Sequence, residues 1–160
     1  IRFFFRHVMH NYPILSAMPV VKCPKTLPVI LDQQEVANMI NSVHKVFYKA
    51  ILMLMYSSGL RQGEVRNLKI TDIDSKRNMI RVDQGKGSKD RYALLSPMAL
   101  AALRTYWKLY RTNLPEHKQS KYLFIPTKNS YNGVFDKGLS HTAVGYMVET
   151  ARKAAGIKKK

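Results

Sequence analysis

The feature that most limits how this chain can fold is a long apolar run that is soon followed by a glycine. Residues 50–56 are almost all apolar, which predicts a core helix over about residues 45–57, buried on nearly every side. Gly59 predicts where this helix stops, because glycine is the usual residue at a helix C-terminus. A second, shorter helical pattern follows and extends to about residue 68. This stretch therefore predicts two helices with a break between them.

An arginine and a glutamate mark the start of the second helix. Arg61 and Glu64 are three residues apart, so they are neighbours on the helix surface. A cation in the first turn lies at the positive end of the helix macrodipole, which favours an anion bound beside it. One interpretation is therefore a phosphate site. The other is a surface ion pair that contributes about 0.3–0.5 kcal/mol. These residues alone leave both interpretations open.

The remaining patterns predict a mainly α-helical fold with a small antiparallel β-hairpin, an α+β class. Strand-like runs at residues 79–83 and 91–95 flank a glycine-rich loop, as in a hairpin. The other expected elements are a helix after the capping box of Asp32 and Glu35, a turn at 71–74, a helix from Ser96-Pro97 to about 111, a short strand at 121–126, and a last helix capped by Ser140 and stopped by Gly156.

The helix that begins at Ser96-Pro97 is expected to have two distinct faces. Helical spacing places four large apolar residues on one face and three basic residues on another. The inward set is Leu100, Leu103, Trp107 and Tyr110, and the basic set is Arg104, Lys108 and Arg111. A basic face of this kind is more often solvated than bound to a ligand.

Proline spacing predicts the domain organisation. Four prolines between residues 12 and 31 exclude a long helix there, so we expect an extended linker. Residues 1–11 are expected to be the remnant of an N-terminal domain, and residues 32–160 the main domain. Lys22 and Lys25 would let the linker run along a phosphate backbone. Because the first residue is Ile1 and not Met, we expect the chain to be cut from a longer protein.

The charge balance points to a polyanionic partner. Lys and Arg number 27 against 10 Asp and Glu, a net charge of +17, and such an excess favours nucleic acid over a membrane surface. The single Cys23 excludes an internal disulfide and suits a reducing cytosol. Nucleophile-elbow, phosphate-loop and zinc-cluster motifs are absent from the sequence, so no metal or cofactor is expected.

Cationic side chains remain as the candidates for chemistry. Lys86 lies between two glycines at the hairpin tip, with Lys89 and Arg91 close behind it. Phosphoryl transfer without a metal needs guanidinium groups to neutralise the phosphorane oxygens and an acid to protonate the leaving oxygen. A lysine whose pKa is lowered by cationic neighbours can be that acid. Arg61 and Lys86 together therefore suggest phosphoryl-transfer chemistry.

The sequence resembles the tyrosine recombinases, also called phage integrases, of the Xer type. The resemblance spans about residues 25–156, and the order and spacing of its motifs make it specific. These motifs are Thr26-Leu27-Pro28-Val29-Ile30 with Glu35-Val36, then Ser58-Gly59-Leu60-Arg61-Gln62-Gly63-Glu64-Val65-Arg66-Asn67-Leu68, Asp72-Ile73-Asp74 and Gly85-Lys86-Gly87-Ser88-Lys89-Asp90-Arg91.

This resemblance implies roles for individual residues. Arg61 matches the first catalytic arginine, which contacts the scissile phosphate, and Glu64 matches the acid that supports it. Lys86 matches the hairpin lysine that acts as general acid toward the leaving 5′-hydroxyl. Lys22, Lys25, Lys89 and Arg91 are expected to contact DNA. The family closes a C-shaped clamp around duplex DNA and recombines it through a 3′-phosphotyrosyl intermediate, without metal or external energy.

The chain also departs from the family pattern. No histidine is followed by arginine three positions later, although the family continues with His-x-x-Arg, a second His or Trp, and the tyrosine nucleophile. Tyr146 precedes that region and is not nominated as the nucleophile. We therefore expect a truncated catalytic domain that binds DNA and does not cleave it. One alternative is a recombinase-like accessory module that never cuts DNA. Another is an unrelated RNA-binding domain, which is disfavoured because the sequence has no RNA-binding signature.

The resemblance also implies the setting in which the complete protein works. Recombinases of this family act as a tetramer on DNA, so we expect a tetramer for the whole protein and no defined oligomer for this chain. The expected location is the bacterial cytosol, associated with the nucleoid. The target site and the biological role, whether chromosome-dimer resolution, phage integration, integron exchange or transposition, do not follow from the sequence.

Overall fold

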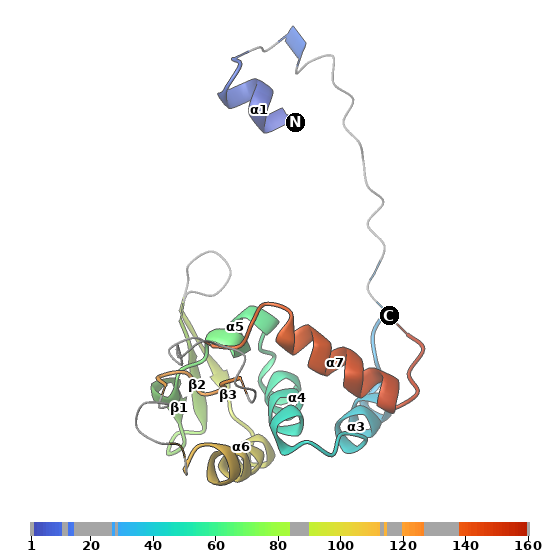
Figure 1. The fold of residues 1–160 in the computed structure, drawn as a ribbon, viewed down its shortest axis with the longest axis vertical. Helices are drawn as coiled ribbons and strands as arrows, with labels where there is room; N and C mark the ends of the chain where they lie inside the picture. The colour runs from blue at the N-terminus through green and yellow to red at the C-terminus, as the bar shows by residue number, and fades with distance from the viewer. Residues whose placement is uncertain are drawn as a thin grey trace. The chain divides into compact units, whose positions relative to one another are not determined.

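The computed structural model describes residues 2–10, 13–14, 27, 29–83, 90–112, 114, 120–126 and 138–159. The chain divides into two compact units, Ile1–Ile30 and Leu31–Lys160. The first unit contains helix α1 (Arg2–His7), in which the rings of Phe3 and His7 lie 4.6 Å apart. The second unit contains the other labelled helices and the β-sheet (Figure 1).

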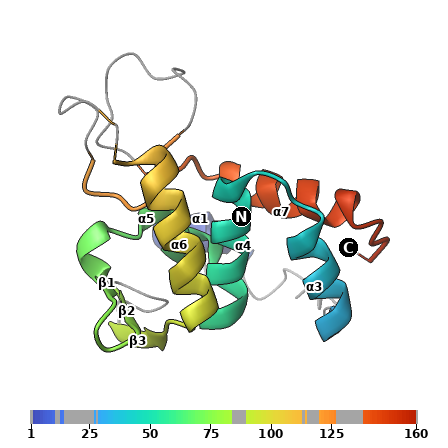
Figure 2. The ribbon, with the colours of Figure 1, turned by 90° about the horizontal axis from the view of Figure 1, so that it is seen from below.

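The second unit is organised around α4 (Val46–Ser58), the helix that the apolar run predicts. Ala50, Ile51 and Leu54 of α4 are completely buried. The helix packs against α3 (Gln33–Asn41), α5 (Gln62–Asn67), α6 (Pro97–Tyr110) and α7 (Ala143–Ala154). Figure 2 shows α4 between α6 on one side and α3 on the other. The predicted core helix is therefore confirmed.

Side-chain caps fix where two of these helices begin. At α3 the carboxylate of Asp32 accepts the N–H of Glu35 at 2.8 Å, and Glu35 accepts the N–H of Asp32 at 2.9 Å. Ser96 accepts the N–H of Ala99 at the start of α6, at 3.1 Å. Both predicted caps are confirmed.

The start of α7 differs from the prediction. Its N-cap is Thr142 and not Ser140, because the carbonyl of Ser140 accepts the N–H of Ala143 in a turn that precedes the helix. The C-terminal end of α7 is as predicted. After α7, Gly156 adopts a left-handed φ of +69°, which ends the helical path.

A three-stranded antiparallel sheet lies beside the helices, in the order β1-β2-β3. The predicted hairpin is β2 (Met79–Val82) paired with β3 (Arg91–Leu94). The predicted turn at 71–74 is wrong. The structure has a 3-10 helix η1 (Ile70–Asp72) and a short strand β1 (Ile73–Asp74), because Ile73 and Asp74 pair with β2. The fold is mainly α with a small antiparallel sheet, as the sequence predicts.

The faces of α6 differ in part from the expectation. Leu103 is buried as predicted, but the residue at the centre of the core is Tyr106, whose ring lies 5.2 Å from that of Phe124. Trp107 is 36% exposed. Arg111 is buried and not part of a solvated basic face, because its guanidinium donates to the carbonyl of Ser120 at 2.7 Å. Helical spacing within α6 does not reveal these contacts, because Phe124 and Ser120 lie later in the chain.

The segment 120–126 contributes to the core and has a single β-bridge, at Tyr122, with bends on either side, in place of the short strand predicted at 121–126. Leu123, Phe124 and Ile125 are buried. Tyr122 forms the bridge with Lys69, and the N–H of Leu123 donates to the carbonyl of Leu68 at 2.7 Å. These bonds attach the segment to the end of α5. They therefore place the side chain of Tyr122 beside a pocket that α5 also lines.

Candidate active site

The turn between α4 and α5 places Arg61 at the edge of a pocket. Gly59 is the C-cap of α4 with φ of +60°, a left-handed conformation that costs glycine little. Arg61 is the N-cap of α5, one position before the first turn that the sequence pattern suggests. Its side chain is 60% exposed. The sharp turn therefore presents a guanidinium to the surface at the end of the core helix.

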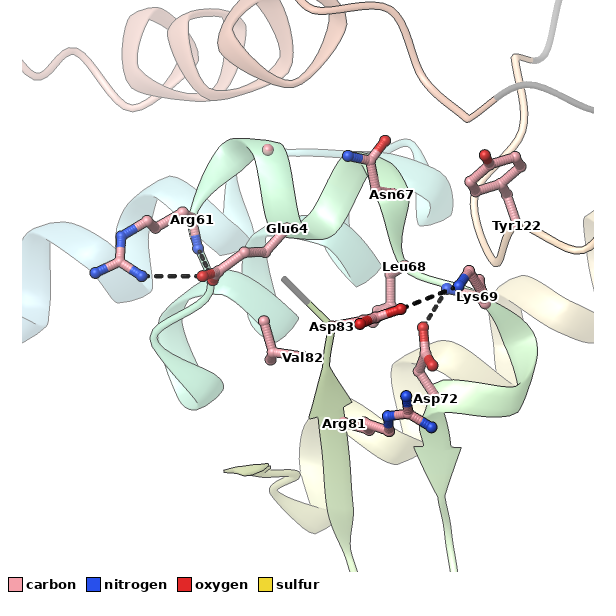
Figure 3. Close-up of a pocket in the computed structure, with 11 residues that line it drawn as sticks. Arg61, Glu64, Asn67, Leu68, Lys69, Asp72, Arg81, Val82, Asp83 and Tyr122 are labelled. Carbon is pink, nitrogen blue, oxygen red and sulfur yellow. Dashed lines mark hydrogen bonds and ion pairs between the residues drawn. The ribbon is translucent and has the colours of Figure 1, made fainter. Parts of the chain in front are cut away.

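The carboxylate of Glu64 receives hydrogen bonds from two arginines, Arg61 and Arg91. Figure 3 shows the bonds from Arg61. One oxygen, Oε1, accepts from Arg61 Nη1 at 2.9 Å. The other, Oε2, accepts the backbone N–H of Arg61 at 2.8 Å and Arg91 Nη2 at 2.7 Å. The Glu64 side chain is only 9% exposed. The i,i+3 ion pair that was one of the two sequence interpretations is therefore present, with Arg61 exposed and the Glu64 side chain mostly covered.

The surroundings keep Glu64 ionised. Burial alone would raise the pKa of this carboxyl group, but the backbone N–H and guanidinium of Arg61, with the charge of Arg91, lower it below its ordinary value. Glu64 is therefore a carboxylate at neutral pH. An ionised acceptor can hold Arg61 in one orientation through charge-assisted hydrogen bonds.

A pocket of about 480 Å³ opens beside this pair. Figure 3 shows Arg61 and Glu64 at one end and Tyr122 at the other. Between them, Lys69 Nζ lies 3.3 Å from Asp83 Oδ2, and the backbone N–H of Lys69 donates to Asp72 at 2.8 Å. The full lining consists of Arg61, Gly63, Glu64, Asn67, Leu68, Lys69, Asp72, Arg81, Val82, Asp83 and Tyr122.

The structure places some of the residues that the sequence singled out and leaves others outside its description. Arg61, Glu64 and Arg91 lie together. The hairpin lysines Lys86 and Lys89, and the linker lysines Lys22 and Lys25, lie outside the described residues.

Sequence reasoning did not find the rest of the pocket. Lys69 and Asp83 are 14 residues apart, and Tyr122 is still more distant in the chain. No local spacing signals that these residues meet. Their contact depends on the strand pairing of β1 with β2 and on the bridge between Lys69 and Tyr122.

Neither a metal centre nor a membrane span is found in the part of the chain that the structure describes. Within those residues, no three His, Cys, Asp or Glu side chains are grouped so that they could hold a metal ion. In the same residues, no helix has both the length and the apolar character needed to cross a bilayer.

Comparison with known proteins finds relatives that are described as integrases or recombinases. The sequence is 44% identical over 112 residues to the putative integrase/recombinase y4eF of Sinorhizobium fredii, covering 69% of this chain and 45% of that protein. It is 34% identical over 136 residues to the tyrosine recombinase XerA of Pyrococcus horikoshii, covering 85% of this chain and 44% of that protein. The chain thus spans about half the length of the curated relatives it matches.

Solved structures agree with the fold. A crystal structure of XerA recombinase matches with a TM-score of 0.70 and 28% identity, over 99% of this chain and 53% of that one. A lambda integrase dimer bound to a COC′ core site matches with a TM-score of 0.66 and 18% identity, over 96% of this chain and 55% of that one. The family model described as the Phage integrase family matches residues 30–160. The chain belongs to the phage integrase family, the tyrosine recombinases.

Proposed function

We propose that this chain forms part of the catalytic domain of a tyrosine recombinase that binds duplex DNA. The observation that carries the proposal is the exposed guanidinium of Arg61, held at the edge of a pocket by the partly buried carboxylate of Glu64. In this assignment residues 32–160 belong to the catalytic domain, residues 12–31 are a linker, and residues 1–11 belong to the core-binding domain.

Arg61 is proposed to bind the scissile phosphate. A guanidinium offers a planar set of donors that matches two phosphate oxygens, and Glu64 occupies only one of its nitrogens, Nη1. Because the side chain is already oriented, little reorganisation is needed when negative charge develops in the transition state. Arg61 would therefore stabilise the phosphorane formed during strand cleavage.

Lys86 is proposed to protonate the leaving 5′-hydroxyl. The support for this role is its position in the Gly85-Lys86-Gly87 motif, between β3 and β2, the strand that contributes Arg81 and Val82 to the pocket. The tyrosine that forms the 3′-phosphotyrosyl bond is not assigned to any residue of this chain. Tyr146 lies in α7 with its side chain 66% exposed, and we give it no catalytic role.

A multimeric assembly on DNA is proposed for the whole protein. The supporting observation is that the fold is shared with a lambda integrase whose structure is a tetramer bound to a Holliday junction.

Charge reversal tests whether the Arg61 edge faces DNA. Arg61→Glu should weaken binding to a short duplex, measured by fluorescence anisotropy, by more than Arg77→Glu does. Arg77 is a matched control, because it is also paired with an acid three residues away and its side chain is 80% exposed. Equal losses in the two variants would show that total charge, and not this edge, controls binding.

A nicked suicide substrate tests the assignment of the nucleophile. The chain should form a complex that is lost on denaturing electrophoresis, since no tyrosine here is proposed to attack the phosphate. A covalent protein–DNA band that disappears in Tyr146→Phe would contradict this assignment. Tighter binding to single-stranded RNA than to duplex DNA would contradict the DNA-binding proposal itself.

A further inference from the structure

The carboxylate of Glu64 is shared between two arginines that come from different elements. Arg61 is the N-cap of α5, whereas Arg91 is the first residue of β3. Arg91 makes the shorter contact, 2.7 Å from Nη2 to Oε2, against 2.9 Å from Arg61 Nη1 to Oε1. Glu64 is therefore neutralised from two sides and not by Arg61 alone.

This sharing determines how much positive charge remains at the pocket edge. An isolated Arg61–Glu64 pair would have no net charge, and the carboxylate would compete with any incoming anion for the guanidinium. With Arg91 included, the three side chains carry a net charge of +1. The Arg61 side chain stays 60% exposed, against 36% for Arg91, so the surplus charge is presented mainly by Arg61.

We propose that Arg91 is a positioning residue that acts through Glu64, and not a DNA contact. It neutralises the carboxylate, so that Arg61 remains oriented by Glu64 and can still attract a phosphate. This proposal rests on the proposed function in one respect, the assignment of a phosphate ligand to Arg61. It differs from the sequence-based expectation, in which Arg91 itself touches DNA.

The contact also connects the β-sheet to the site. Arg91 pairs with Val82 in the β2–β3 register, and Val82 and Asp83 line the pocket. A shift of β3 relative to α5 would therefore lengthen the Arg91–Glu64 contact and change the charge balance at Arg61. The position of the hairpin strands and the anion affinity of Arg61 are coupled through one carboxylate.

A double-mutant cycle with inorganic phosphate tests the proposal on the chain as it is. Phosphate is titrated into ¹⁵N-labelled protein, and binding is followed at the Arg61 side-chain Nε–H signal, identified by its absence in Arg61→Ala. Arg91→Gln should weaken phosphate binding about three- to tenfold, because the carboxylate of Glu64, no longer shared, then competes with phosphate for the guanidinium of Arg61. In a Glu64→Gln background the same change should cost less than about twofold, since no carboxylate is left to neutralise.

Two further variants separate charge sharing from other causes. Arg91→Lys keeps the charge and should remain within about twofold of the wild type. Arg77→Gln removes an exposed, acid-paired arginine elsewhere and should also remain within about twofold. A loss in Arg91→Lys as large as in Arg91→Gln, or an equal loss in Arg77→Gln, would overturn the proposal.

The remaining outcomes distinguish this inference from the proposed function. An equal loss for Arg91→Gln in both backgrounds means that the charge of Arg91 acts on the anion without Glu64, by contact or through space, which overturns the positioning role and leaves the Arg61 site intact. No phosphate response at Arg61 in the wild type overturns the anion site and the inference with it. If Arg91→Gln does not fold, as judged by its amide spectrum, the neutral variant Arg91→Met takes its place, with and without Glu64→Gln, and the same outcomes decide the question.

Discussion

Glu64 connects the residues of the site, because its partly buried carboxylate accepts three hydrogen bonds from two arginines. Its lowered pKa makes its contribution to stability dependent on pH. A carboxyl group whose pKa is lower in the folded than in the unfolded protein stabilises the fold above its unfolded pKa, and this stabilisation is lost as pH falls through the folded pKa.

Glu64→Gln should therefore destabilise the protein at neutral pH and much less in acid. We expect a loss of about 1.5–3 kcal/mol at pH 7, the range for hydrogen bonds to charged groups, measured by urea unfolding. The difference from wild type should shrink as pH falls below the ordinary carboxyl pKa of 4.5. Asp83→Asn is the control, since Asp83 pairs with Lys69 at a partly exposed position, 3.3 Å from Oδ2 to Nζ. A constant difference at all pH values would contradict this account.

At the scale of elements, the close approach of residue 138 to α5 limits what that position can hold. A Cβ on Gly138 would lie 2.2 Å from the backbone oxygen of Arg66 and 3.3 Å from the ring of Tyr122. Gly138→Ala should destabilise the fold by about 1–3 kcal/mol, the cost of overpacking a rigid site. Gly63→Ala in α5, whose Cβ would meet nothing within 4 Å, should instead stabilise it by up to about 1 kcal/mol. Denaturation midpoints of the two variants should move in opposite directions.

The contact between α6 and segment 120–126 depends on one buried phenol. Tyr106 donates to the carbonyl of Leu123 at 3.2 Å, and burial raises the pKa of Tyr106 to about 12, so the donor persists at neutral pH. Tyr106→Phe should cost about 1–2 kcal/mol, because the carbonyl loses its partner in the core. Tyr92→Phe, at a position 68% exposed, should cost less than about 0.5 kcal/mol. Similar losses in both would show that the buried bond contributes little.

The sequence predicts elements whose signals are local. The capping box at Asp32 and Glu35, the break at Gly59 and the β2–β3 hairpin all depend on neighbours in the chain, and the structure has them. Strand β1 was missed because its two residues have strand geometry only through pairing with Ile80 and Met79. Arg111 was misplaced because its partner, the Ser120 carbonyl, lies beyond the helix that displays the pattern.

The same distinction, between local signals and contacts between distant residues, applies to the candidate site. The Arg61–Glu64 spacing is visible in the sequence, and the two side chains are bonded in the structure. The contact of Arg91 with Glu64 spans 27 residues, and the pairing of Lys69 with Asp83 spans 14. Such contacts are set by sheet register and helix packing, which no short motif encodes.

For the whole molecule, the net charge of +17 should dominate association with DNA. Three of the 10 acidic residues, Glu64, Asp72 and Asp83, line the pocket, so most of the attraction must come from surfaces outside it. If about six phosphates are neutralised, affinity should fall by about a thousandfold between roughly 50 and 200 mM salt. Anisotropy titrations across that range measure the slope. A flat dependence would contradict an electrostatic DNA-binding surface.

The central position of α4 has a consequence for how the molecule opens. This helix packs against α3, α5, α6, α7 and β3, so an opening that frees its amides must separate it from most of the second unit. Amide protons at Ile51 and Leu54 should therefore be among the last to exchange with deuterium, at a rate set by global unfolding. Because Arg61 follows α4 after a two-residue turn, the most persistent helix of the unit also anchors its candidate catalytic arginine.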